Sequence, residues 1–184
     1  MLKERAARQA ETRSRIVESA IELHRTKGPA NTTLSEVARL AGVQRHTLYR
    51  HFPDERSLSF ACSGTYIERN PAPDPSPWRR IADPRTRLHR GLNELYAYFE
   101  ANEAMFTCVL RDAEFHDLTR EMFTLRSGER LGEIRSVLSE GLSGARALAL
   151  LDLALDFRTW RRLRDSGLAR EDAVETMVDA VATS

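Results

Sequence analysis

The sequence has few of the features that mark secreted, membrane-spanning or disulfide-bonded chains. Its two cysteines among 184 residues are too few for a disulfide framework and favour a reducing compartment. The longest apolar run, residues 145–157, is interrupted by Arg146, Asp152 and Asp156, so we expect no membrane partner and no spanning helix. The first residues, MLKERAARQAETR, are charged throughout and lack the apolar stretch of a secretory signal. We therefore expect a cytoplasmic protein.

Patterns typical of catalytic sites are also missing. The sequence has no glycine-rich phosphate loop and no nucleophile elbow. His89, Cys108 and His116 are spaced unlike any common zinc site. We therefore expect no enzyme activity, no metal and no cofactor. A small helical metal- or redox-sensing protein stays open as an alternative, although Cys62 and Cys108 lie in apolar contexts that suit buried, inert thiols.

The charge distribution is uneven along the chain, although the formal net charge is only +1. Residues 1–60 contain eleven Lys or Arg and seven Asp or Glu, a net charge of +4. The remaining residues contain seventeen Lys or Arg and twenty Asp or Glu, a net charge of −3. A basic first part joined to a mildly acidic second part indicates that only the first part meets a polyanion.

Helical periodicity covers nearly the whole chain, and no run of alternating β-branched residues predicts a strand. The pattern predicts an all-α fold of about nine helices. The first helix is expected over about 12–27, the third over 44–52 and the eighth over about 145–165. Asp54 and Asp83 are expected to cap the fourth and fifth helices.

Residues 33–52 have the layout of a helix-turn-helix. Thr33 and Glu36 form a capping box at the start of a short helix, and Gly42 ends that helix about two turns later. Leu48 and Phe52 lie one turn apart and should face inward. The opposite side of the third helix then carries side chains that suit base edges and phosphates: Gln44, Arg45, His46 and Tyr49. The alternative is a short amphipathic bundle helix with a solvated polar face.

From Ile16 to Tyr66 the chain resembles the DNA-binding domain of the TetR family of transcriptional regulators. The resemblance rests on the run IVESAIELHRTKG in the first helix and on TTLSEVARLAGVQRHTLYRHFPDERSL after it. The elements TT, EVA..AGV and TLY.HF are specific when they occur together. The rest of the chain has no motif of its own, but an all-helical second part of this length suits the family's plan.

The resemblance implies eight DNA-contacting residues: Thr33, Ser35, Gln44, Arg45, His46, Thr47, Tyr49 and His51. The first two lie at the start of the second helix, where they would contact phosphate or base. Gln44, Arg45 and His46 hold the positions that choose the sequence. Thr47 would contact backbone or base, and the last two residues would contact phosphates.

Three features of the basic part leave alternatives open. Many relatives carry a lysine where this chain has Glu55, so either Arg56 substitutes for it or that phosphate contact is lost. His46 stands where a small residue is common, and it either adds a base contact or crowds the groove. The basic N-terminal residues form either an arm into the minor groove or a disordered tail: Lys3, Arg5, Arg8 and Arg13.

Four of the seven prolines lie within residues 70–77, which we interpret as a linker or loop. Together with the resemblance, this division implies a TetR-type DNA-binding domain over 1–69 and an all-helical ligand-binding and dimerisation domain over 78–184. A single chain of this size can hardly bury all the apolar side chains of the segment 148–157. We therefore expect a homodimer through the last two helices that binds a palindromic operator in double-stranded DNA. The alternative is a buried central helix in a monomer.

The middle helices contain most of the bulky side chains, which predicts a cavity for a small, largely apolar effector molecule. Tyr96, Phe99, Phe106 and Phe123 are our candidates for its lining, with ordinary core packing as the alternative for each. The resemblance implies a transcriptional repressor, since repression is the family's usual mode, and with such a cavity we expect it to release DNA when a ligand binds. A dimeric DNA-binding protein without a ligand is the other possibility.

Overall fold

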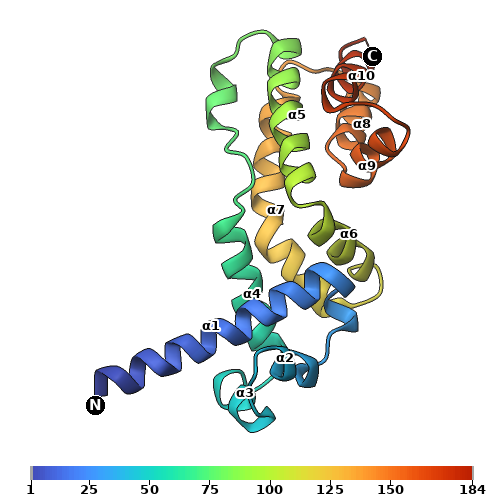
Figure 1. Cartoon of the computed structure of the whole chain (residues 1–184). Coiled ribbons are helices and arrows are strands. Elements are labelled where there is room, and N and C mark those ends of the chain that lie inside the picture. Colours follow the sequence, from blue (N-terminus) through green and yellow to red (C-terminus); the bar gives the residue numbers. More distant parts are fainter. Residues whose placement is uncertain (1, 184) are drawn as a thin grey trace. The chain divides into compact units, whose positions relative to one another are not determined.

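The computed structural model describes residues 2–183 and confirms the predicted all-α fold. These residues form ten α-helices, α1–α10, with two short 3-10 helices, η1 and η2, and they contain no strand (Figure 1). They divide into two compact units: one contains the residues up to Pro71 together with Ala104–Arg126, and the other contains Ala72–Glu103 together with the residues from Ser127 onward. Within residues 2–183, no helix combines the length and the hydrophobicity needed to cross a membrane.

The first unit contains the predicted helix-turn-helix. Its helices are α1 (Leu2–Lys27), η1 (Pro29–Asn31), α2 (Leu34–Leu40), α3 (Arg45–His51), α4 (Glu55–Arg69), α6 (Glu103–Asp112) and the first part of α7 (Asp117–Ser139). α1 packs on both α2 and α4, and α2 packs on α3; Figure 1 shows α2 and α3 on one side of α1. The shared core consists of apolar side chains, among them Ile16, Ala20, Val37, Ala38, Leu48, Phe52 and Leu58.

α1 begins at Leu2 rather than near Thr12, which corrects the predicted start. The prediction followed the apolar face, and that face begins only at Ile16, the first buried residue of the helix. Residues 3–11 are helical without being buried. Their composition explains this, because alanine, arginine, glutamine and glutamate are all strong helix formers.

The second unit is built around α5 (Pro84–Ala101), which packs against α10 (Arg170–Ala182). It also contains η2 (Ser76–Arg80), the later part of α7, α8 (Ala145–Ala154) and α9 (Phe157–Asp165). Asp83 caps α5 as predicted, since its carboxylate accepts a hydrogen bond from the Thr86 N–H at 2.8 Å. The proline-rich stretch is non-helical as far as Pro75 and then enters η2.

The helix predicted over 145–165 is two helices, α8 and α9, and this break accounts for the tenth helix. Asp156 causes the break. Its side chain accepts hydrogen bonds from the backbone N–H groups of Arg158 and Thr159 at 2.7 and 3.1 Å, and so caps a new helix. The continuous apolar pattern of the segment therefore does not indicate the second helix start at Asp156.

Candidate nucleic-acid interface

The start of α2 is fixed by the predicted capping box. The Glu36 N–H donates to the Thr33 hydroxyl at 3.2 Å, and the Thr33 N–H donates to the Glu36 carboxylate at 2.9 Å. Lys27, the last residue of α1, forms an ion pair with the same carboxylate at 2.5 Å. Lys27 and the Thr33 groups together lower the pKa of Glu36 to about 2. The carboxylate is therefore charged at neutral pH and links α1 to α2.

The turn between α2 and α3 depends on Gly42. Its φ of +65° lies in the left-handed region that favours glycine. The Gly42 N–H donates to the Arg39 carbonyl at 3.2 Å, and the Val43 N–H donates to the Ala38 carbonyl at 2.9 Å. This pair of hydrogen bonds is the Schellman arrangement that closes a helix C-terminus. It sets the direction in which α3 leaves the turn.

α3 has an inward side and an outward side, as the spacing predicted. Leu48 is completely buried, and Phe52, which ends the helix, is 2% exposed. The outward side carries four exposed side chains: Gln44, Arg45, His46 and Tyr49. The Gln44 side chain makes no capping hydrogen bond to the helix that it precedes. α3 is therefore a short rod anchored through its apolar side, with hydrogen-bonding groups on the other.

Arg45 and Tyr49 lie one turn apart and contact each other. The Arg45 Nη2 donates to the Tyr49 hydroxyl at 3.4 Å, and its guanidinium lies 5.9 Å from the centre of the Tyr49 ring. This contact extends both side chains along the exposed surface of α3. An arginine in that position presents the paired donors that match a guanine edge or a phosphate.

The end of α3 is surrounded by positive charge. The Arg13 guanidinium of α1 lies 4.9 Å from the centre of the Phe52 ring. Burial, followed by the positive charges of Arg50 and Arg13, lowers the pKa of His51. These neighbours favour the neutral form of His51 in the DNA-free protein.

The structure brings the eight predicted DNA-contacting residues onto two neighbouring elements. Thr33 and Ser35 are at the start of α2, and the other six lie on α3 or at its N-cap. Of those six, Thr47 and His51 are partly buried. Two exposed residues beside them escaped the sequence analysis, namely Arg39 in the last turn of α2 and Arg50 on α3. Their positive charge, next to the predicted recognition helix, is the sequence feature that points to them.

Arg56, at the start of α4, is already engaged within the unit. Its guanidinium forms a two-point ion pair with the carboxylate of Glu121 on α7, with one contact at 2.9 Å. Both side chains are about half exposed, and exposed pairs of this kind contribute only about 0–1 kcal/mol. Any phosphate contact by Arg56 would have to replace this pair.

The C-terminal end of α6 docks on the connection between α1 and α2. Asp112 is completely buried, and its carboxylate accepts hydrogen bonds from the Ala30 N–H at 2.9 Å and from the Arg111 Nε at 2.8 Å. Arg111 also donates to the Lys27 carbonyl at 2.7 Å. Gly28 makes room for this contact, because a Cβ there would lie 2.2 Å from the Asp112 carboxylate. α6 thus contacts the segment that positions α2.

Both cysteines are buried in the first unit. The Cys62 sulfur lies 3.6 Å from the Nδ1 of His24, and burial raises the pKa of the Cys62 thiol to about 12. A thiol with that pKa is not a reactive thiolate at neutral pH. In residues 2–183, no three metal-ligating side chains are grouped as a metal ion requires.

The four residues proposed to line an effector cavity form two separate pairs. Tyr96 and Phe99 stack in the second unit with ring centres 6.3 Å apart, and the Tyr96 hydroxyl donates to the Ala154 carbonyl at 3.0 Å. Phe106 and Phe123 meet edge to face in the first unit at 6.4 Å. Tyr96 and Phe99 are almost completely buried, as expected for core packing.

The N-terminal basic residues are neither an extended arm nor a disordered tail. Lys3, Arg5, Arg8 and Arg13 all lie on α1, and all are exposed. This finding replaces both of the alternatives that the sequence left open. A helix with its side chains is about 10–12 Å across, whereas the minor groove is about 6 Å wide. A minor-groove arm is therefore excluded for this segment as folded.

Comparison with known proteins identifies the same region. Residues 16–62 match the model of the bacterial regulatory proteins of the tetR family. The HTH-type transcriptional regulator SrpR of Pseudomonas putida is 42% identical over 52 residues, a match that spans 28% of this chain but only 24% of SrpR. The uncharacterized HTH-type transcriptional regulator Mb2274c of Mycobacterium bovis is 27% identical over 180 residues, covering 94% of this chain and 88% of that protein.

The fold comparison extends over nearly the whole chain. The TetR-family regulator PfmR of Thermus thermophilus aligns with a TM-score of 0.62 at 22% identity, covering 92% of this chain and 97% of that one. At this identity the likeness concerns the fold. Residues 16–62 are thus similar to the DNA-binding domain of the tetR family of bacterial regulatory proteins, and the chain shares the fold of PfmR.

Proposed function

We propose that the protein is a sequence-specific DNA-binding repressor. The observation that carries this proposal is the outward side of α3, where Gln44, Arg45 and His46 are exposed while Leu48 and Phe52 anchor the rod. Glutamine and arginine side chains form paired hydrogen bonds with adenine and guanine edges in the major groove. Thr33 and Tyr49 would hold backbone phosphates and so fix the position of α3.

The proposed binding unit is a homodimer on a palindromic operator. One helix-turn-helix contacts only a few base pairs, and a two-fold dimer places two such helices about 34–36 Å apart, or further by whole helical turns. α8 carries exposed residues at successive turns that suit close helix packing: Ala145, Ala149 and Leu153. The apolar side chains of α10 are buried within their own chain, so the dimer surface that we propose lies mainly on α8 and α9.

The proposed signal is a small, largely apolar molecule that shifts the protein toward a conformation with low DNA affinity. The Asp112 contact between α6 and Ala30 supports α6 as the element that transmits it. A ligand that displaces α6 would disturb the segment on which α2 rests. Tyr96 and Phe99 in the second unit and Phe106 and Phe123 in the first stay our candidates for effector contacts, each pair within its own unit.

Selection of bound duplexes from a random pool tests the DNA-binding proposal. We expect a two-fold symmetric site to emerge, and an enriched pool without symmetry would contradict the dimeric mode of binding. Effector binding is tested separately by screening apolar compounds for a rise in melting temperature and for DNA release. Compounds that stabilise the protein at saturation without weakening DNA binding would contradict ligand release.

A further inference from the structure

α1 is much longer than the part of it that packs against other helices. The helix contains 26 residues, from Leu2 to Lys27. Ile16 is its first buried residue, whereas residues 3–11 are all exposed. At 1.5 Å per residue, the part that precedes Arg15 extends about 20 Å. Its strong helix formers keep it helical, and the side chains of residues 3–11 face solvent rather than the core.

The core of the first unit does not include this segment. Residues 3–14 also lack an apolar stripe, since alanines are their only apolar side chains. They therefore offer little to a lipid surface or to an apolar groove of another protein. Their distinguishing property is charge.

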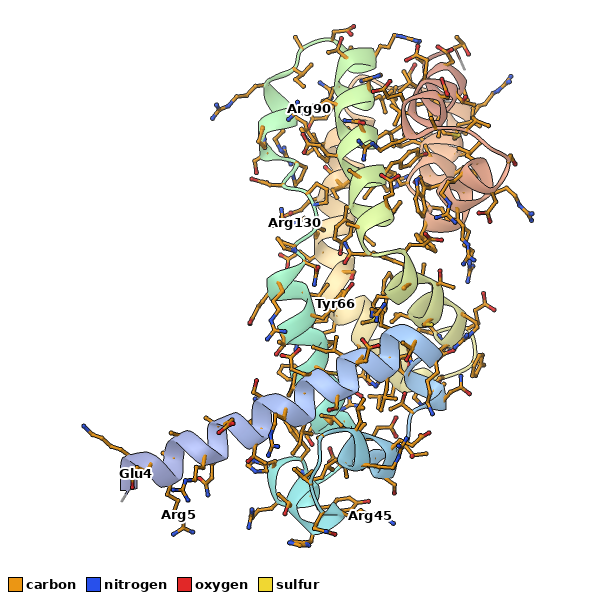
Figure 2. The ribbon with its side chains drawn as sticks, viewed as in Figure 1. Glu4, Arg5, Arg45, Tyr66, Arg90 and Arg130 are labelled. Atoms are coloured by element: carbon orange, nitrogen blue, oxygen red, sulfur yellow. The ribbon has the colours of Figure 1, made fainter. Side chains whose placement is uncertain are left out.

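Residues 3–15 contain five Lys or Arg and two Glu, a net charge of +3. This positive charge is continuous with the basic end of α3, because Arg13 lies over the Phe52 ring and contributes to lowering the pKa of His51. In the view of Figure 2, Arg5 points away from α1 toward the side of the first unit on which α3 carries Arg45. A polyanion bound at α3 would meet this segment next.

We propose that residues 3–14 of α1 form a second DNA-contacting element, a helical rail that binds backbone phosphates flanking the bases read by α3. Arg5, Arg8 and Arg13 are its phosphate-binding residues. The rail is wider than the minor groove, so it contacts the backbone from outside. Since phosphate contacts carry no sequence information, the rail adds affinity and lengthens the site without changing base preference. This inference rests on the proposed DNA-binding function.

The length of the rail sets the expected footprint. About 20 Å corresponds to roughly six base pairs at 3.4 Å per pair along one strand. Binding of the full chain is therefore measured on duplexes that share the selected site and differ in flank length from zero to about ten base pairs on each side. We expect affinity to rise with flank length up to about six base pairs and then to level off.

The test variant is the double substitution Arg5→Gln with Arg8→Gln, in side chains that make no core contact. We expect it to lose most of the gain from longer flanks. The slope of log affinity against log salt should fall by about two per chain, close to one for each phosphate contact. The base preference found by selection should stay the same.

The matched control is Arg80→Gln with Arg90→Gln, which removes the same charge from exposed positions in the second unit. It should keep the flank dependence and the salt slope of the wild type. The rail is refuted if the Arg5/Arg8 variant keeps both of them, or if the control loses them equally. If the wild type binds no duplex selectively, the proposed function itself fails, which is a different result from loss of flank dependence alone.

Discussion

Arg45 and Tyr49 contact each other on α3, yet they should differ in what they contribute to DNA recognition. Replacing Arg45 with alanine removes paired donors suited to a base edge. We expect this change to cost about 1–3 kcal/mol of binding free energy and to relax preference at one position of each half-site. Tyr49→Phe removes only a hydroxyl and should weaken all duplexes alike. Affinity measured on single-base variants of the selected duplex distinguishes the two effects. Equal losses on every duplex for Arg45→Ala would contradict its assigned role.

His24 makes stability depend on pH. Burial lowers its pKa from 6.5 to about 4, and the charge of Asp112 offsets only part of this shift. The folded state therefore binds fewer protons at this site than the unfolded state between those values. The free energy of unfolding should be highest above pH 6.5 and should fall as the pH falls toward 4, by up to about 3 kcal/mol.

Urea unfolding at several pH values between about 7 and 4.5 measures this dependence. His24→Gln removes the titrating group and should flatten the profile in that window, whatever its effect at neutral pH. A variant whose stability falls as steeply as that of the wild type would show that other groups cause the loss.

At the scale of elements, the docking of α6 on the α1–α2 connection depends on Gly28. Its φ is +97°, and a Cβ would lie 2.2 Å from the Asp112 carboxylate. Gly28→Ala should therefore destabilise the protein by about 2–4 kcal/mol, combining backbone strain with disturbance of a buried hydrogen bond. Gly42→Ala is the matched control, because Gly42 also has a positive φ but nothing lies within 4 Å of its added Cβ.

Gly42→Ala should lower the free energy of unfolding only by the backbone strain, about 1–2 kcal/mol. Chemical denaturation of the two variants measures both losses of stability. If Gly42→Ala were as destabilising as Gly28→Ala, the contact between Asp112 and Ala30 would contribute little, and the proposed route through α6 would lose its support.

Local signals in the sequence were enough to predict the DNA-facing elements. The Thr33–Glu36 capping box, the Gly42 turn and the Asp83 cap each act over a few residues, so their spacing is visible in the chain. The inward Leu48 and Phe52 likewise follow from helical periodicity.

Features that depend on distant residues were not predictable in this way. The ion pair of Arg56 with Glu121 and the burial of Asp112 beneath Ala30 join segments 65 and 82 residues apart. The assignment of Phe106 and Phe123 to one compact unit and of Tyr96 and Phe99 to the other is also a property of tertiary packing. The apolar pattern of residues 145–165 is that of one helix, and the cap by which Asp156 divides it is a single polar side chain within that pattern.

At the scale of the whole molecule, the proposed dimer depends on the exposed side of α8. Leu153 is 54% exposed there. Leu153→Glu would place a charge in the proposed interface and should shift the protein to monomers, with at least about a tenfold loss of affinity for a duplex with two half-sites. Sedimentation velocity and binding titration measure these two effects. Leu125→Glu, at a leucine with 56% exposure in the first unit, is the control that should stay dimeric.

The most direct test of the central claim compares binding of the wild-type chain to two duplexes. One is the selected duplex, and the other is a permuted duplex of equal length and composition. Both are titrated across a salt series, and the stoichiometry of each complex is determined. The account predicts two chains per selected duplex and a preference over the permuted duplex of about 10³-fold or more. A protein that stays monomeric and binds both duplexes equally, even at low ionic strength, would contradict it.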